Sequence, residues 1–307
     1  MPGAAPFGLS GVGSSSSGDR ASHVSAQDLT PARHAGDLGR SARRYNLTRG
    51  RRLDRPRYVA PMPENYFEAR VAERYDEEDE SADPAIVDPI VDFLVDVARG
   101  GVALELGIGT GRVALPLAAR GVPVHGLELS EAMAARLRAK AGADRVAVTI
   151  GDFATTRVEG SFSLAYLVAN TIMNLTTQDE QVACFENVAA HLDPGGCFVV
   201  EVMVPALQRL PPGEMYRPFD VSPTYLGFDE YDVARQRLVS HHYSIRDGVA
   251  DAHSIPFRYV WPAELDLMAR LAGMTLRERW SGWRREPFTS ESTKHVSVWK
   301  KPPVVRG

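Results

Sequence analysis

The fold of this chain is decided by the stretch Ala-Leu-Glu-Leu-Gly-Ile-Gly-Thr-Gly-Arg at residues 103–112. Its first four residues, apolar except for one glutamate, predict a buried parallel strand. Three glycines at alternate positions, Gly107, Gly109 and Gly111, then predict a tight turn into a helix over 112–120. Glycine adopts backbone angles that other residues avoid, and it lets a ligand lie against bare main chain. We therefore expect a ligand at this turn.

Glu105 lies two residues before the first of these glycines, at the end of the predicted strand. A lone carboxylate there is costly without a partner, and a cationic group of the ligand would supply one. A dinucleotide site is an alternative, but its G-x-G-x-x-G fingerprint needs a glycine at position 112. That position holds Arg112, which disfavours a nicotinamide-dependent oxidoreductase. A glycine turn without any ligand is the other alternative that the stretch leaves open.

The stretch resembles the E/D-x-G-x-G-x-G signature that ends the first strand of class I S-adenosylmethionine (SAM)-dependent methyltransferases. The resemblance extends over about residues 66–301, and the blocks at 193–205 and 294–299 resemble bacterial members that act on small molecules. It implies an α/β fold with a Rossmann-like seven-stranded sheet in the order 3-2-1-4-5-7-6, in which the last strand is antiparallel. It also implies that SAM is the cofactor and that the chain is a methyltransferase.

The chain around the stretch alternates between strand and helix patterns, which by itself predicts a parallel sheet with helices on both faces. Asp83-Pro84 begins a helix before the signature strand. Ser130 caps the helix after the second strand, and Thr177 with Glu180 forms a capping box. The later strands are expected at 122–127, 146–150, 162–168, 197–204, 276–280 and 295–299, and the later helices at 131–141, 177–192 and 265–271, with a break at 193–196.

Residues 205–261 interrupt this alternation. They begin as a loop rich in proline and tyrosine and continue as strands. The ranges 237–246 and 249–261 flank Asp247-Gly248, a strong hairpin turn signal. We expect this inserted antiparallel β-hairpin to form a lid over the carboxyl ends of the strands, where ligands bind in open α/β sheets.

The resemblance assigns residues of this chain to each part of SAM. The glycine turn would approach the methionine moiety, and Glu105 would face its ammonium group directly or through water. Glu128, at the end of the second strand, would accept hydrogen bonds from both ribose hydroxyls. Asp152, after the third strand, would accept a hydrogen bond from the adenine amine. The other expected contacts are Phe153, Leu129 and Met133 at the adenine, Val168 and Asn170 at the cofactor tail, Arg112 after the turn, and Tyr66 and Tyr75 on an amphipathic helix over the cofactor. For the two tyrosines a plain core position is an equal alternative.

Methyl transfer asks the protein chiefly for alignment and exclusion of water, because the sulfonium is an activated donor. A general base helps only an acceptor such as a phenol or hydroxyl. His241, His242 and Tyr243 are weak candidates on a predicted strand, where one histidine would face the cleft and the other solvent. A structural role for both histidines is the favoured interpretation, so the catalytic residues remain open.

Composition narrows the class of protein. Hydrophobic residues make up 44% and charged residues 24%, as in soluble globular proteins. No apolar run approaches the ~20 residues of a membrane span, and no secretory signal is visible at the first residues. Cys184 and Cys197 show no metal or redox spacing, which indicates free thiols in a reducing compartment. We expect a cytoplasmic protein without a metal.

Charge is distributed unevenly along the chain. Residues 1–60 carry ten arginines, no lysine and four aspartates, so their net charge is +6 and that of residues 61–307 is −10. We expect 1–60 to be a disordered Arg/Gly/Ser-rich extension and 61–307 to be the methyltransferase domain. An acidic body does not favour nucleic acid, and the Asn/Asp-Pro-Pro-Tyr and Pro-Cys motifs of DNA methyltransferases are absent.

Three readings of the function therefore stay open. The favoured one is methyl transfer to a small-molecule acceptor, through an unknown O, N or C atom. The first alternative is a protein or nucleic-acid methyltransferase that uses the arginine-rich arm, and the second is a SAM-binding regulatory protein without transfer activity. The acceptor and the oligomeric state cannot be read from the sequence.

Overall fold

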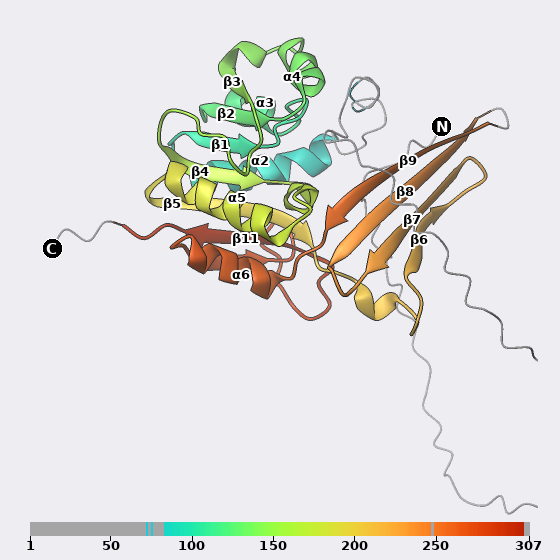
Figure 1. Ribbon diagram of the computed structural model, residues 1–307. Helices are drawn as coiled ribbons and strands as arrows, with labels where there is room; N and C mark the ends of the chain where they lie inside the picture. Colours follow the sequence, from blue (N-terminus) through green and yellow to red (C-terminus); the bar gives the residue numbers. More distant parts are fainter. Residues whose placement is uncertain (1–71, 73–74, 76–82, 247–248, 304–307) are drawn as a thin grey trace, which may run out of the picture. The chain divides into compact units, whose positions relative to one another are not determined.

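The computed structural model describes residues 72, 75, 83–246 and 249–303 (Figure 1). The expected extension over 1–60, Tyr66 and the turn residues Asp247 and Gly248 lie outside the described residues. Ala72 and Tyr75 both have helical backbone, in the segment where the sequence predicted an amphipathic helix.

The central sheet has seven strands in the order β10-β11-β5-β4-β1-β2-β3, which confirms the predicted topology. β11 is antiparallel to both of its neighbours, while the strands from β5 to β3 are parallel. The strands are β1 (Ala103–Leu106), β2 (Val124–Glu128), β3 (Val146–Ile150), β4 (Phe162–Leu167), β5 (Leu192–Met203), β10 (Thr275–Trp280) and β11 (Lys294–Lys300).

Helices begin where the sequence predicted caps. Asp83 accepts from the backbone N–H of Ala85, Ser130 accepts from that of Met133, and Thr177 forms a complete capping box with Glu180. These bonds satisfy N–H groups that a helix leaves unpaired in its first turn. The α-helices are α2 (Pro84–Ala98), α3 (Ala114–Ala119), α4 (Glu131–Arg138), α5 (Gln178–His191) and α6 (Pro262–Leu271), and the 3₁₀ turns are η2 (Ala143–Arg145), η3 (Thr171–Asn174) and η4 (Leu207–Arg209).

The Asp-Pro-Gly-Gly segment at 193–196 does not separate α5 from β5, as the sequence predicted, but lies inside β5. Phe162 of β4 pairs with Leu192 of β5, and Leu164 pairs with Cys197. β5 therefore advances five residues where β4 advances two. Gly195 has φ 88°, which glycine tolerates. The segment is therefore a bulge within the strand.

Both faces of the central sheet are buried, because side chains alternate along each strand. Leu104 and Leu106 of β1 belong to a core that α5 and α6 cover. Ala103 belongs to a second core, which α2 and α3 cover. Glu105 is two residues after Ala103, so its side chain points to the same face of the sheet, the face that α2 covers.

The insertion after β5 forms a four-stranded antiparallel sheet rather than a single hairpin. The predicted hairpin is confirmed, with β8 (Arg237–Arg246) paired to β9 (Val249–Arg258) along its whole length. β6 (Tyr216–Val221) and β7 (Tyr225–Asp232) extend it. Pro218 lies at a register shift in β6, an edge strand, where a missing N–H costs little.

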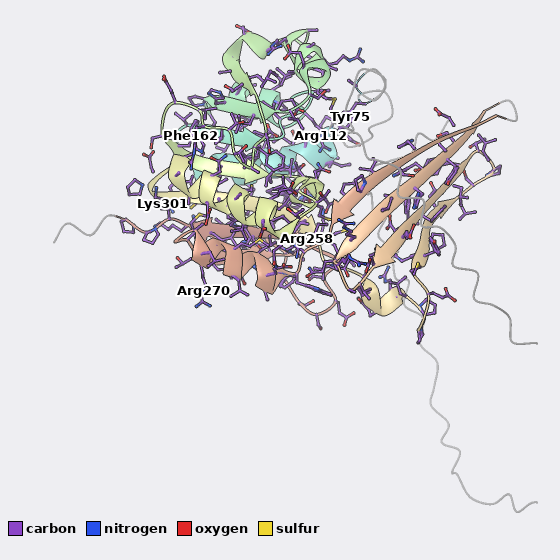
Figure 2. All side chains as sticks on the ribbon, viewed as in Figure 1. Tyr75, Arg112, Phe162, Arg258, Arg270 and Lys301 are labelled. Atoms are coloured by element: carbon purple, nitrogen blue, oxygen red, sulfur yellow. The ribbon has the colours of Figure 1, made fainter. Side chains whose placement is uncertain are left out.

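A buried ion pair joins this sheet to α6, and a hydrogen bond of the same arginine joins it to α5. Arg258, at the end of β9, donates to Glu264 at 2.6 Å and to Gln181 at 2.5 Å (Figure 2). Gln181 in turn donates to the carbonyls of Ile172 and Leu175, in the segment after β4. The base of the inserted sheet is thereby fixed to the loop that follows β4.

Candidate active site

The turn after β1 is built from three left-handed glycines. Gly107, Gly109 and Gly111 have φ of 66°, 57° and 83°. The turn is closed by the N–H of Gly111, which donates to the Ile108 carbonyl at 3.0 Å. Side chains are disfavoured at such angles, so the main chain of the turn carries none at these positions, although Leu137 and Leu115 fill the space beside Gly111.

Glu128, the last residue of β2, is bonded to this turn. One carboxylate oxygen accepts from the N–H of Gly109 at 2.7 Å, and the other accepts from the N–H of Ser130 at 2.9 Å. Glu128 is only 7% exposed, and burial raises the pKa of its carboxyl. The sequence predicted this carboxylate beside the glycines but not its bonds to their backbone.

Three side chains close around the glycines. A Cβ built on Gly107 would lie 2.9 Å from Thr171 Cγ2 and 3.8 Å from the Phe153 ring, and one on Gly109 would lie 3.5 Å from Met133 Cε. Phe153 and Met133 were expected at this site from the sequence. Thr171 was missed, because nothing in its local sequence indicates which loop faces the turn.

The tips of β2 and β3 carry the other residues expected near an adenine. Asp152 follows β3 and accepts from the N–H of Ala154 at 2.8 Å through one carboxylate oxygen. Leu129, beside Glu128, is 49% exposed although it is apolar. An aromatic base lying against this tip would cover the apolar surface of Leu129.

Glu105 has a partner that the sequence did not predict. Its carboxylate accepts from the hydroxyl of Tyr166 at 2.9 Å, and the two residues are direct neighbours in the pairing of β1 with β4. Glu105 is 3% exposed, and burial raises the pKa of its carboxyl to about 8 against the lowering effects of Tyr166 and of the charge on Arg112. A cation arriving near Glu105 would therefore favour loss of its proton.

The chain bends sharply after β4, in the segment expected to meet the cofactor tail. Ala169 and Asn170 are consecutive non-glycine residues with φ of 53° and 63°. Val168 precedes them, and its carbonyl accepts from the Thr171 hydroxyl at 2.7 Å. Non-glycine residues in this region carry strain, which concentrates at functional sites.

Arg112 and Tyr75 are two further residues that the sequence predicted as cofactor contacts. Arg112 lies directly after the glycine turn, and its charge acts on Glu105. Tyr75 is half-buried and has helical backbone. Figure 2 labels both side chains.

The weak catalytic candidates are held within the inserted sheet. His241 bonds to Ser254 at 2.8 Å and Glu230 at 3.3 Å, and it stacks on Phe228. His242, on the opposite face of β8, bonds to the hydroxyl of Tyr225. Its ring stacks on His253 at 4.7 Å, and Tyr243 stacks on Phe228 at 5.9 Å.

The surroundings of His242 determine the charge of its ring. Burial, with the positive charge of His253 and His241, lowers the pKa of His242 to about 4, so its ring is neutral at pH 7. Among the described residues, all hydrogen-bond and stacking partners of His241 and His242 belong to the inserted sheet. The structure does not bring either ring into contact with the glycine turn.

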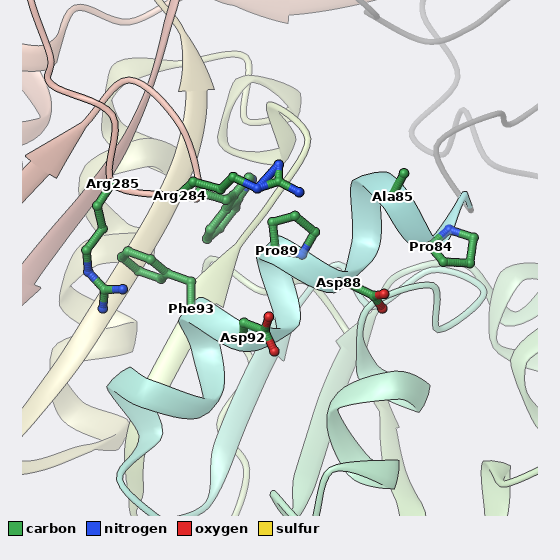
Figure 3. Close-up of a pocket in the computed structure, with 9 residues that line it drawn as sticks. Pro84, Ala85, Asp88, Pro89, Asp92, Phe93, Arg284 and Arg285 are labelled. Atoms are coloured by element: carbon green, nitrogen blue, oxygen red, sulfur yellow. The ribbon is translucent and has the colours of Figure 1, made fainter.

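A separate cavity of about 330 Å³ lies between α2 and the loop after β10. Figure 3 shows Phe93 and Asp92 on the helix and Arg284 and Arg285 on the loop, and Trp283 completes this side. Within the described part of the chain, its lining includes no residue of the glycine turn. It is therefore distinct from the candidate active site.

The glycine turn and the carboxylates beside it fit a nucleoside that carries a cationic amino-acid tail. Bare backbone accommodates close approach, Glu128 and Asp152 supply acceptors on adjacent strand tips, and the Glu105 carboxyl responds to a positive charge. Across the described ranges, no three His, Cys, Asp or Glu side chains are grouped as metal ligands. No described helix is both long and apolar enough to cross a membrane.

Comparisons with known proteins agree with this geometry. A family model described as a methyltransferase domain matches residues 103–196. The chain is similar to the CcbJ methyltransferase from Streptomyces caelestis, with 37% identity, a TM-score of 0.69, and coverage of 76% of this chain and 96% of that one. It is 27% identical over 212 residues to the cypemycin N-terminal methyltransferase of a Streptomyces species, covering 66% of this chain and 84% of that protein.

The fold is also that of the SAM-bound CalS10, an amino pentose methyltransferase from Micromonospora echinaspora. The identity is 21%, the TM-score is 0.56, and the match covers 78% of this chain and 99% of that one. The likeness to CcbJ spans nearly the whole of that enzyme, and the matched family model begins at the first residue of the signature strand. The chain therefore belongs to the class I SAM-dependent methyltransferases, with SAM as its cofactor.

Proposed function

We propose that this enzyme transfers the methyl group of SAM to a small-molecule acceptor, by in-line displacement at the carboxyl ends of β1 and β4. The observation that carries the placement is the bond between Glu128 and the Gly109 N–H, which joins two strand tips around a bare glycine turn. SAM supplies an activated methyl group on its sulfonium. The residues of the chain bind it, orient it and exclude water.

Each strand tip has a separate task in this proposal. Gly107, Gly109 and Gly111 admit the methionine moiety, and Glu105 responds to its ammonium charge. The Glu128 carboxylate bonds to Gly109 and Ser130, and the acceptor capacity that remains on its two oxygens would accept from the ribose hydroxyls. The further cofactor contacts are Asp152, Phe153, Leu129, Met133, Val168, Asn170, Arg112, Tyr66 and Tyr75.

Support for a small acceptor comes from the relatives and from the insertion. The name of one similar enzyme specifies an amino pentose as its substrate. In this chain, the inserted sheet is fixed through Arg258 and Gln181 to the segment after β4, beside the expected methyl position. We assign residues 205–261 the role of a lid that shapes the acceptor pocket within the domain 61–307.

A second candidate acceptor is the amino terminus of a peptide, which the likeness to the cypemycin N-terminal methyltransferase favours. Both acceptors are tested by incubating the enzyme with methyl-labelled SAM and a bacterial extract that has been separated into a small-molecule fraction freed of peptides and a macromolecular fraction that includes the peptides. Label in the small-molecule fraction supports the proposal. Label confined to the macromolecular fraction, or no label at all, contradicts it.

The arginine-rich segment 1–60 provides a further discrimination. A small-molecule enzyme that lacks these residues should retain its turnover, because the proposed cofactor contacts and the proposed lid all lie in 61–307. An enzyme that binds a macromolecule through the arm would lose activity on deletion, and the activity of its full-length form would fall as the salt concentration rises.

A further inference from the structure

Glu201 is a fourth carboxylate at the strand tips, after Glu105, Glu128 and Asp152. It lies near the end of β5, as the single charged residue in an otherwise apolar run of that strand. Its side chain is 12% exposed. A carboxylate so enclosed needs several partners, and the structure supplies them from three separate segments.

The first partner is the bend after β4. One oxygen of Glu201 accepts from the backbone N–H of Ala169 at 3.1 Å. The Glu201 carbonyl accepts from the N–H of Asn170 at 3.3 Å, and the Asn170 side chain accepts from the N–H of Met203 at 2.7 Å. The two left-handed residues of the bend are thus bonded to two residues of β5.

The second and third partners, Trp283 and Lys294, donate hydrogen bonds to the other carboxylate oxygen of Glu201. It accepts from the indole N–H of Trp283 at 3.0 Å and from the ammonium of Lys294 at 3.1 Å. Both come from the chain between β10 and the start of β11. Because both of its sides face donors, the carboxylate cannot turn away from Ala169 without losing a bond.

The bend continues directly to the glycine turn. Thr171 donates from both its backbone N–H and its hydroxyl to the Val168 carbonyl, at 3.1 and 2.7 Å. Its methyl group is the atom that a Cβ on Gly107 would strike. A displacement of the bend would therefore move the wall of the cofactor site.

We infer that Glu201 is a positioning residue for SAM, which holds the left-handed bend at Ala169 and Asn170 so that residues 168–171 present their backbone to the cofactor tail. This inference deepens the proposed function, because it rests on the placement of SAM at these strand tips. Glu201 touches neither substrate nor reacting atoms in this account.

The test is the affinity for S-adenosylhomocysteine, measured by calorimetry, which requires no acceptor. Glu201→Leu removes both acceptor oxygens with little change of volume, and we expect its dissociation constant to rise about 10-fold. Glu186→Leu, the same change at an exposed site on α5, is the matched control and should leave affinity unchanged. Should the leucine variant fail to fold, Glu201→Gln replaces it, with an expected loss of about 3-fold because one side keeps an acceptor.

A second substitution separates positioning from general stability. Glycine adopts left-handed angles without strain, so Ala169→Gly should keep the bend without its carboxylate anchor. We expect Ala169→Gly to restore most of the affinity in the Glu201→Leu background. A folded Glu201→Leu with wild-type affinity, or a double variant without recovery, would overturn the inference.

Glu128→Ala, measured alongside, identifies which claim has failed. If SAM does not lie at these strand tips, neither Glu128→Ala nor Glu201→Leu will weaken binding. If only the role of Glu201 is wrong, Glu128→Ala alone will do so. Neither result depends on which acceptor the enzyme methylates.

Discussion

The carboxylate of Glu128 and the backbone N–H of Gly109 lie 2.7 Å apart, and this bond joins the tip of β2 to the turn after β1. The second oxygen of the Glu128 carboxylate accepts from the backbone N–H of Ser130, which is the N-cap residue of α4. One side chain therefore sets the position of the glycine turn, the strand tip and the start of a helix. The candidate cofactor site is organised around that side chain.

The glycine turn should not tolerate a side chain at Gly107. We expect Gly107→Ala to lower the free energy of unfolding by roughly 3 kcal/mol, because left-handed strain and overlap with Thr171 add together. Gly142→Ala is the matched control, since Gly142 has φ 84° and no atom near a built Cβ. It should cost only about 1 kcal/mol in urea unfolding. Equal losses for the two variants would argue against close packing at the turn.

The buried Glu105 carboxyl should make stability depend on pH. Its pKa is raised from 4.5 to about 8 in the folded chain, so the folded state keeps a proton that the unfolded chain releases. The contribution is complete below pH 4.5 and is lost as pH rises through about 8, with a slope of up to about 1.4 kcal/mol per pH unit. Glu105→Gln keeps an acceptor for Tyr166 and should remove this slope from unfolding curves measured without cofactor. An identical slope in the variant would contradict the assignment.

The ion pair at the base of the inserted sheet should be important for stability. Arg258 and Glu264 have side chains that are 6% and 15% exposed, and breaking such a pair by removing one partner costs about 3–5 kcal/mol. We expect Arg258→Met to show a loss of this size in chemical unfolding. Arg235→Met breaks the exposed pair with Asp232 and should cost about 1 kcal/mol or less. A loss as small for Arg258→Met would show that the sheet is held by apolar packing instead.

Much of the fold could be predicted because its signals are local. β3 was predicted with its observed bounds, since Val146–Ile150 is rich in β-branched residues and Gly151 ends the run. The caps at Asp83, Ser130 and Thr177 act within three residues, so they can be read directly from the chain. The glycine turn was predictable for the same reason, because three left-handed positions need three glycines.

The contacts that complete the site could not be predicted, because they join distant segments. Tyr166 reaches Glu105 across 61 residues, and this contact depends on the register between β1 and β4. Glu201 takes donors from 32, 82 and 93 residues away. A signal did exist for Glu201, a lone acid in an apolar strand, but only the folded chain shows what surrounds it.

The insertion illustrates the same limit. Asp247-Gly248 predicted the β8–β9 hairpin correctly, because a tight turn encodes its own strand pairing. β6 and β7 pair through longer connections, and Pro218 weakens the strand pattern of β6. The histidines of β8 were predicted to alternate between the two faces, and the structure shows them with different partners on each face.

SAM should bind where Glu128 bonds to the glycine turn, and the affinity of Glu128→Ala for S-adenosylhomocysteine tests this placement most directly. Calorimetry should show a dissociation constant raised by about 10- to 100-fold, since the variant loses its bonds to the backbone and to the ribose. Glu131→Ala, which removes an exposed acid three residues later, should bind like the wild type. A folded Glu128→Ala with unchanged affinity would contradict the account.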